Sequence, residues 1–187
     1  MPTLVTHAII GGAAAIALTS NTSWDQTAKY EAALLSVLCS VLPDADVIGF
    51  AFDVPYAHFF GHRGFFHSLS FALILGVTSA CLFPREAPFL SRQWWLLAAY
   101  FCALSCSHGV LDACTQGGLG VALLSPFDAT RYRFSFAPFE AAPLSVQHMF
   151  TPWGLRVLRM EVLFLWLPAL LVAFWCRWRA GRSGSLR

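Results

Sequence analysis

Residues 94–113, WWLLAAYFCALSCSHGVLDA, form an apolar run that closes with a histidine and an aspartate. A membrane-spanning helix needs about 20 predominantly apolar residues, so this stretch is long enough to cross a bilayer. On a helix, His108 and Asp112 lie on one face, one turn apart. The stretch therefore predicts a transmembrane helix with two metal-binding side chains near one end. A buried histidine–aspartate hydrogen bond that serves only packing is the alternative for an isolated pair.

The composition of the rest of the chain agrees with a membrane location. Of 187 residues, 57% are hydrophobic and only 12% are charged, which leaves too few charges to cover a soluble surface. The length predicts a single domain. The net charge of +2 is not gathered into a basic stripe, so we expect no direct binding of nucleic acid.

Four further apolar runs occupy residues 4–19, 30–43, 66–83 and 157–178. Together they predict an all-α, multi-pass membrane helical bundle with about four to five membrane-embedded helices. The runs at 66–83, 94–113 and 157–178 are long enough to span. The first two are marginal and fit half-spans or re-entrant helices buried in protein. The first run also resembles the apolar core of a signal peptide, although no lysine or arginine precedes it.

The remaining segments predict the domain organisation. We expect one membrane-embedded domain over residues 1–180, in which residues 114–156 form a loop cap over one face. A basic tail at 181–187 follows, and its arginines favour a cytoplasmic C-terminus.

Polar residues stand at the ends of the apolar runs, at positions that share one face of the bundle if all five runs cross the membrane. Ionisable groups at membrane depth are candidates for function by default. Eight of them are candidate metal ligands: His7, Asp44, Asp46, His62, His67, His108, Asp112 and Glu161.

The stretch HRGFFHS at residues 62–68 is the sharpest of these clusters. Arg63 carries a planar guanidinium suited to phosphate or carboxylate, and the helix predicted to start near His67 can direct its first amides at an anion. The histidines could instead be interfacial polar residues. His58, one turn before His62, is a candidate supporting residue, whereas His148 fits an ordinary surface histidine.

The other two clusters are weaker. The Pro43-Asp44-Ala45-Asp46 step places two carboxylates in a turn, where they can enter one site or remain solvated. Glu161 either completes a metal site or pairs with an arginine on its own helix.

Imidazoles and carboxylates together favour Zn, Mn or Fe over Ca or Mg. The number of ligands allows one or two ions, and a pair of ions would activate water and stabilise a displaced oxygen. The sequence contains no P-loop, GxGxxG, HExxH or serine elbow, so nucleotide-driven and covalent serine chemistry are unsupported.

Several motifs together resemble a known family. They are THAIIGG (6–12), LPDADV (42–47), GHRGFFHSL (61–69), SHGVLDACTQGG (107–118) and LSPF (124–127). Over nearly the whole chain they resemble the bacterial inner-membrane-associated metal-dependent hydrolases of the YdjM type, also described as LexA-binding. More distantly, the chain is similar to zinc phospholipase C and P1-type nucleases, all-helical enzymes with histidines and aspartates around a metal cluster.

The resemblance implies a metal-dependent hydrolase of phosphoesters in the bacterial inner membrane, with Zn as the first choice and Mn or Fe as alternatives. Its partners would be the lipid bilayer and a small phosphoester or lipid headgroup. Asp46 is the predicted general base and Arg63 the predicted catalytic anion-binding group. The predicted substrate-binding residues are Arg63, Ser68, Arg131 and Arg133. A metal or proton transporter and a non-catalytic protein with a structural metal are the alternatives.

Overall fold

The computed structural model describes residues 1–83, 87–143 and 145–184, which form an all-α bundle. Its longer helices are α1 (Leu4–Thr19), α2 (Gln26–Val41), α3 (Leu69–Cys81), α4 (Arg92–Ala113), α5 (Pro152–Glu161) and α6 (Leu167–Gly184). Its shorter elements are η1 (Leu42–Phe52), η2 (Phe65–His67), η3 (Val146–Phe150), η4 (Val162–Trp166), β1 (Thr115–Gln116) and β2 (Phe139–Glu140). Arg85 and the last three residues of the predicted basic tail, 185–187, lie outside the described residues.

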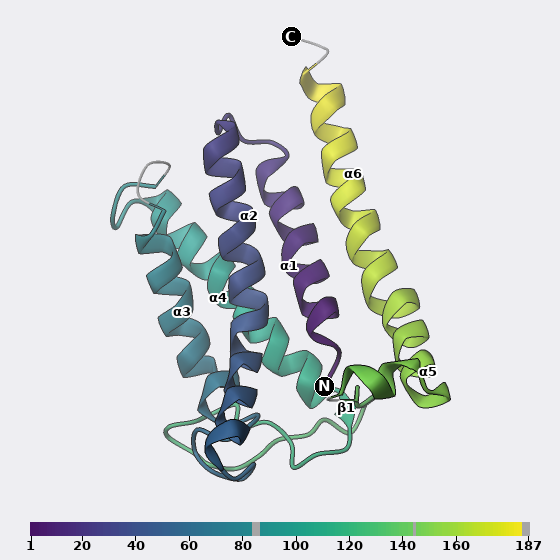
Figure 1. Cartoon of the computed structure of the whole chain (residues 1–187). Helices are drawn as coiled ribbons and strands as arrows, with labels where there is room; N and C mark the ends of the chain where they lie inside the picture. The colour runs from purple at the N-terminus through teal and green to yellow at the C-terminus, as the bar shows by residue number, and fades with distance from the viewer. Residues whose placement is uncertain (84–86, 144, 185–187) are drawn as a thin grey trace.

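The helices run up and down, so every second end falls on the same side of the bundle (Figure 1). The N-terminus lies at the lower end in Figure 1, whereas α6 ends at the upper end. Helices α1 to α4 form the packed body, and α6 lies along α1. This arrangement confirms the predicted all-α bundle and brings together the helix ends that carry the polar motifs.

Small residues allow the helices to approach closely. A Cβ added at Gly76 of α3 would lie 2.6 Å from the backbone nitrogen of Cys102 on α4. Small residues at helix contacts are typical of membrane proteins, where close van der Waals packing replaces the hydrophobic effect. Larger side chains fill the centre, and Phe101 of α4 and Phe83 are both fully buried.

The lengths of the membrane-spanning helices differ in part from the predictions. Among the described residues, three helices are long and apolar enough to cross a membrane: Gln26–Phe52, Arg92–Ala113 and Pro152–Arg182. The predictions over 94–113 and 157–178 are therefore confirmed. The prediction over 66–83 was wrong in extent, because Ser68 caps α3 and leaves it 13 residues. The marginal run at 30–43 is longer than predicted, because η1 continues α2 without a break.

The long connection between α4 and α5 lies at the lower end of the bundle in Figure 1. Its two short strands pair in parallel, with Thr115 opposite Phe139. Val121 and Tyr132 form a further bridge inside the connection. The connection lies beside the ends of α1, η1 and α4, where the polar motifs are. It ends before Pro152, where α5 begins, so the last residues of the stretch predicted as a cap, 114–156, are helical.

Candidate metal centre

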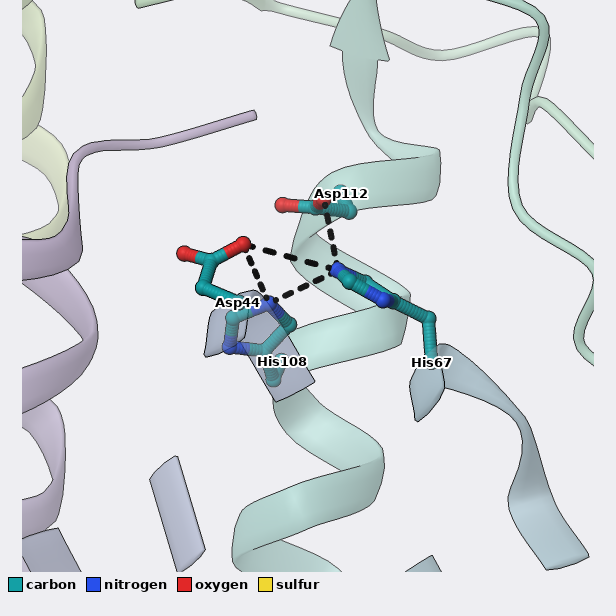
Figure 2. Close-up of side chains that lie close together, drawn as sticks. All are labelled: Asp44, His67, His108 and Asp112. Atoms are coloured by element: carbon teal, nitrogen blue, oxygen red, sulfur yellow. Dashed lines mark hydrogen bonds and ion pairs between the residues drawn. The ribbon is translucent and has the colours of Figure 1, made fainter. Parts of the chain in front are cut away.

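Asp44, His67, His108 and Asp112 converge from three elements to form what we call the central cluster. Asp44 lies on η1, His67 ends η2, and the other two lie on α4. Figure 2 shows both imidazole rings and both carboxylates around one point. One ligand atom from each residue lies within 4.8 Å of the others. This spacing is what a single bound cation requires of four ligands.

The shortest distances join nitrogen and oxygen atoms that can bind a metal. The Nε2 atoms of His67 and His108 are 3.1 Å apart. Asp44 Oδ1 is 3.6 Å from His67 Nε2 and 3.4 Å from His108 Nε2. Asp112 Oδ2 is 3.5 Å from His67 Nε2. Two nitrogen and two carboxylate ligands fit Zn, Mn or Fe better than Ca or Mg.

The carboxylates of the central cluster are buried without adequate hydrogen bonding. Asp112 is fully buried and Asp44 is 2% exposed. Both oxygens of Asp44 and Oδ1 of Asp112 form no hydrogen bond with the described residues. A buried charge without partners is costly, and buried carboxylates are normally paired or coordinate a metal. The residues present therefore fit a divalent cation.

Each histidine of the central cluster is oriented by a group behind it. His108 Nδ1 lies 2.7 Å from the carbonyl oxygen of Ser40, which can only accept, so Nδ1 donates and Nε2 faces the cluster. His67 Nδ1 lies 3.1 Å from Asp46 Oδ2. Such contacts behind a histidine set its tautomer and its ring orientation in metal sites.

Asp46 and His62 form a second group, which we call the His62–Asp46 pair. His62 Nδ1 lies 2.7 Å from Asp46 Oδ1, and Asp46 Oδ2 accepts from the backbone N–H of Arg63 at 3.1 Å. These two residues and His67 are also close enough to hold an ion. Because both oxygens of Asp46 already accept hydrogen bonds, the pair fits a charged support beside His67 better than a second metal site.

The environment of His67 favours its charged form. Burial by itself lowers the pKa of this imidazole, but the carboxylates of Asp44 and Asp46 outweigh it and raise the pKa to about 9. The same negative charge that favours a proton on His67 also favours a cation at the central cluster.

The backbone of α4 must come close to η2 to bring His67 to His108. A Cβ added at Gly109 would lie 2.6 Å from the carbonyl oxygen of His67. Glycine beside His108 therefore permits this approach, since any larger residue would push η2 away. The HxxxD motif depends on the glycine that it contains.

His7 lies against the central cluster. Its ring stacks on His108 with centroids 3.7 Å apart, and its Nε2 lies 3.7 Å from Asp112 Oδ1. It is buried, and Nε2 forms no hydrogen bond with the described residues. The position agrees with the prediction that His7 faces the same site.

Arg63 joins the central cluster to a cavity. It is only 2% exposed, and its Nε donates to Asp112 Oδ2 at 3.1 Å. With His62 it lines a cavity of about 380 Å³, which we call the polar cavity after these two side chains, although most of its wall is apolar. His148, predicted as a surface histidine, also lines it, as does Trp153. The spacing of residues in the sequence does not show that His148 lies at this cavity. The one sequence signal is its position in the long connection that was predicted to cover the site.

Three other predicted site residues have different surroundings. Arg131 donates to the carbonyl oxygens of His62 and Tyr56, each at 3.0 Å, so it holds the loop in place. Arg133 lies on a separate depression beside Gln116. Ser68 accepts from the N–H of Phe71 and caps α3.

Glu161 is buried but lies outside the central cluster and the His62–Asp46 pair. Its oxygens accept from the backbone N–H and the hydroxyl of Thr3, at 2.7 and 2.6 Å, and from the hydroxyl of Thr6 at 2.6 Å. Trp166 donates to the same Thr6 hydroxyl. These contacts bind the start of α1 to α5 and η4, in place of the predicted metal ligation or pairing with an arginine.

The fold and the site define a helical membrane protein with a buried cluster of histidines and aspartates at one end of the bundle. The chain belongs to the family described as YdjM inner membrane protein, whose model matches residues 1–182. This confirms the predicted YdjM family and the inner membrane location, whereas the comparisons give no support for LexA binding or for the similarity to zinc phospholipase C and P1-type nucleases.

A relative is similar over almost the full length. Inner membrane protein YbcI of Escherichia coli (strain K12) is 33% identical over 184 residues, which cover 96% of this chain and 99% of that protein. No solved structure matches the chain.

Proposed function

We propose that this protein is a membrane-bound hydrolase of phosphoesters that uses one divalent cation held by the central cluster. The observation that supports this most is the set of three buried carboxylate oxygens, on Asp44 and Asp112, that form no hydrogen bond with the described residues. Zn is the first choice and Mn or Fe the next, from the ligand types. Asp44, His67, His108 and Asp112 would hold the cation, with His7 at its edge.

A divalent cation bound there would polarise a phosphoryl oxygen and lower the pKa of a water molecule. Arg63 would position the substrate. Its guanidinium contacts Asp112 on one side and lines the polar cavity on the other. A planar guanidinium matches the oxygens of a phosphate group and adds charge-assisted hydrogen bonds.

The His62–Asp46 pair would transfer the proton. His62 lines the polar cavity, and its Nδ1 is held by Asp46, which leaves Nε2 as the atom that can exchange a proton. In the proposed reaction a water oxygen bonds to phosphorus and the ester P–O bond breaks. One water proton passes through His62 to the departing alcohol oxygen. Asp46, predicted as the general base, becomes a positioning residue because both of its oxygens are engaged.

The arginines at the end of α6 support a cytoplasmic C-terminus, since positive charge is enriched on that side of inner membranes. The central cluster lies at the opposite end of the bundle, so it would face the other side of the membrane.

A structural metal is the alternative that one observation favours. The central cluster is buried, and closed sites with four protein ligands are typical of structural zinc. Access from the polar cavity through Arg63 supports the hydrolase instead. A transporter would have its ligands near the middle of the membrane, whereas these lie at one end of the helices.

The test is elemental analysis of the protein purified in detergent, together with hydrolysis of a panel of phosphoesters. We expect about one transition-metal ion per chain and metal-dependent turnover. Asp112→Asn should lose both, whereas Asp53→Asn, at an exposed residue with a φ of 56° that asparagine tolerates, should retain both. Wild-type protein without bound metal would refute the proposal, and a bound metal without turnover on any ester would support the structural alternative.

A further inference from the structure

A second cavity of about 530 Å³ lies beside the central cluster, and we call it the apolar cavity. It is enclosed by the start of α1, η1, η3, α5 and η4. Its walls are mostly hydrocarbon, with Val5, Val47, Phe50, Met149, Leu158 and Trp166 among them. The volume lies within the range of about 300–1,000 Å³ that is usual for ligand sites.

The apolar cavity reaches the proposed site directly. Asp44, a member of the central cluster, lies in its wall. Met1, Ala142 and Pro143 line this cavity and the polar cavity alike, so the two cavities adjoin. The two cavities thus meet at these three residues, and Asp44 of the central cluster lies in the wall of the apolar cavity.

The side chains around the apolar cavity also connect it with the bilayer. Leu4 and Val5 on α1 are each 53% exposed, and Phe50 is 39% exposed. In a membrane-spanning chain, exposed apolar side chains of this kind face lipid rather than water. These exposed side chains would give a hydrocarbon chain an apolar path from the membrane into the apolar cavity.

We propose that the apolar cavity binds the hydrocarbon chain of an amphiphilic phosphoester whose phosphate group lies at Arg63 and the central cluster. This inference rests on the proposed function and specifies its substrate class. It explains why one site has both a cavity lined by His62 and Arg63 and a cavity lined by Val47 and Leu158. A water-soluble phosphoester would use only the polar cavity.

The first test compares methyl, butyl and octyl esters of 4-nitrophenyl phosphate in one detergent. Each buried methylene contributes about 0.8 kcal/mol, so kcat/KM should rise by up to about fourfold per methylene until the chain fills the cavity. Leu158→Trp, which narrows the cavity, should reduce the advantage of the octyl ester over the methyl ester severalfold. Leu155→Trp, at an exposed residue of the same helix, is the matched control.

Equal dependence on chain length in wild type and Leu158→Trp would overturn the inference, because partition into micelles would then explain it. A second measurement needs no turnover and works even if the variant does not fold. Octyl phosphate with a diazirine at the chain end is photolysed on the wild-type protein, and the labelled peptides are identified by mass spectrometry.

We expect the photolabel on residues 47–50 or 149–158. Labelling confined to the lipid-facing surface of α6 would overturn the inference. The two proposals can fail separately. Absence of hydrolysis of every ester refutes the hydrolase while the photolabel still decides the chain site, and equal hydrolysis of all esters refutes only the chain site.

Discussion

The Nε2 atoms of His67 and His108 lie 3.1 Å apart inside the protein, and each ring is held by a different group behind it. Two imidazole lone pairs at this distance repel each other unless a proton or a cation lies between them. The carboxylates of Asp112 and Asp44 lie beside these two nitrogens and supply negative charge there. This contact between residues 41 positions apart is the geometric core of the site.

The Asp44→Asn substitution tests the role of Asp44 as a metal ligand. With a chelator present, the amide removes a buried carboxylate that pairs with His67 and His108, and we expect stability to fall by about 1–3 kcal/mol. With zinc at about 100 times its Kd, the wild type should gain about 2.7 kcal/mol and the variant much less. Thermal unfolding in detergent measures both. An identical response to zinc in the two proteins would contradict the ligand role of Asp44.

The Arg63→Lys substitution tests recognition of the phosphate. Lysine retains the charge but lacks the planar fork, and charge-assisted hydrogen bonds contribute about 1.5–3 kcal/mol each. We therefore expect kcat/KM to fall by about 10–100-fold for a phosphoester. Arg133→Lys, at an exposed arginine on a separate depression, is the control and should leave kcat/KM unchanged. Equal kinetics in the two variants would show that Arg63 does not bind the substrate.

The His62→Gln substitution separates proton transfer from metal binding. A general acid or base contributes about 10²–10⁴-fold, so kcat should fall by that factor while the metal content stays at the wild-type level. Asp46→Asn should give a similar loss, and the double variant should be little worse than either single variant because the two residues act as one unit. His58→Gln, at an exposed histidine of the same loop, is the control. Loss of metal from His62→Gln would instead support its predicted role as a ligand.

The Gly109→Ala substitution tests the approach of α4 to η2. The added methyl group would lie 2.6 Å from the carbonyl oxygen of His67, and overpacking of this kind costs about 1–3 kcal/mol. We expect a lower melting temperature and weaker metal binding. Gly12→Ala, where a Cβ meets nothing within 4 Å, should be neutral or stabilising. Similar melting temperatures for the two variants would rule out this contact as a constraint.

The Glu161→Gln substitution distinguishes the observed contacts of this residue from its predicted metal ligation. The amide cannot accept at both ends from Thr3 and Thr6, so we expect a loss of about 1–3 kcal/mol in stability. Metal content should not change. Glu140→Gln is the control, since that carboxylate pairs with Arg156 at the surface, at 3.6 Å. A variant that loses its metal but keeps its stability would restore the predicted ligand role.

Several features of the fold could be predicted because they depend on local sequence. The apolar run at 94–113 has the length of a span, and the spacing of His108 and Asp112 places them on one helical face. Alternation of helix direction then brings the polar ends together. The start of α3 after Ser68 was not predicted, because residues 65–67 form the separate element η2. The continuation of α2 into η1 was not predicted either, because Pro43 normally ends a helix.

The sequence by itself determined a helical membrane protein and the residue types of a metal site at one end of its bundle, since helix length and the spacing of polar residues follow from local chemistry. Only the tertiary structure decided which of those residues meet. In that structure Asp44 lies beside His67, Asp46 lies behind His67, and Glu161 accepts hydrogen bonds from Thr3 and Thr6. The reason is physical, because contacts between distant residues depend on how helices pack and on which ring nitrogen each neighbour holds.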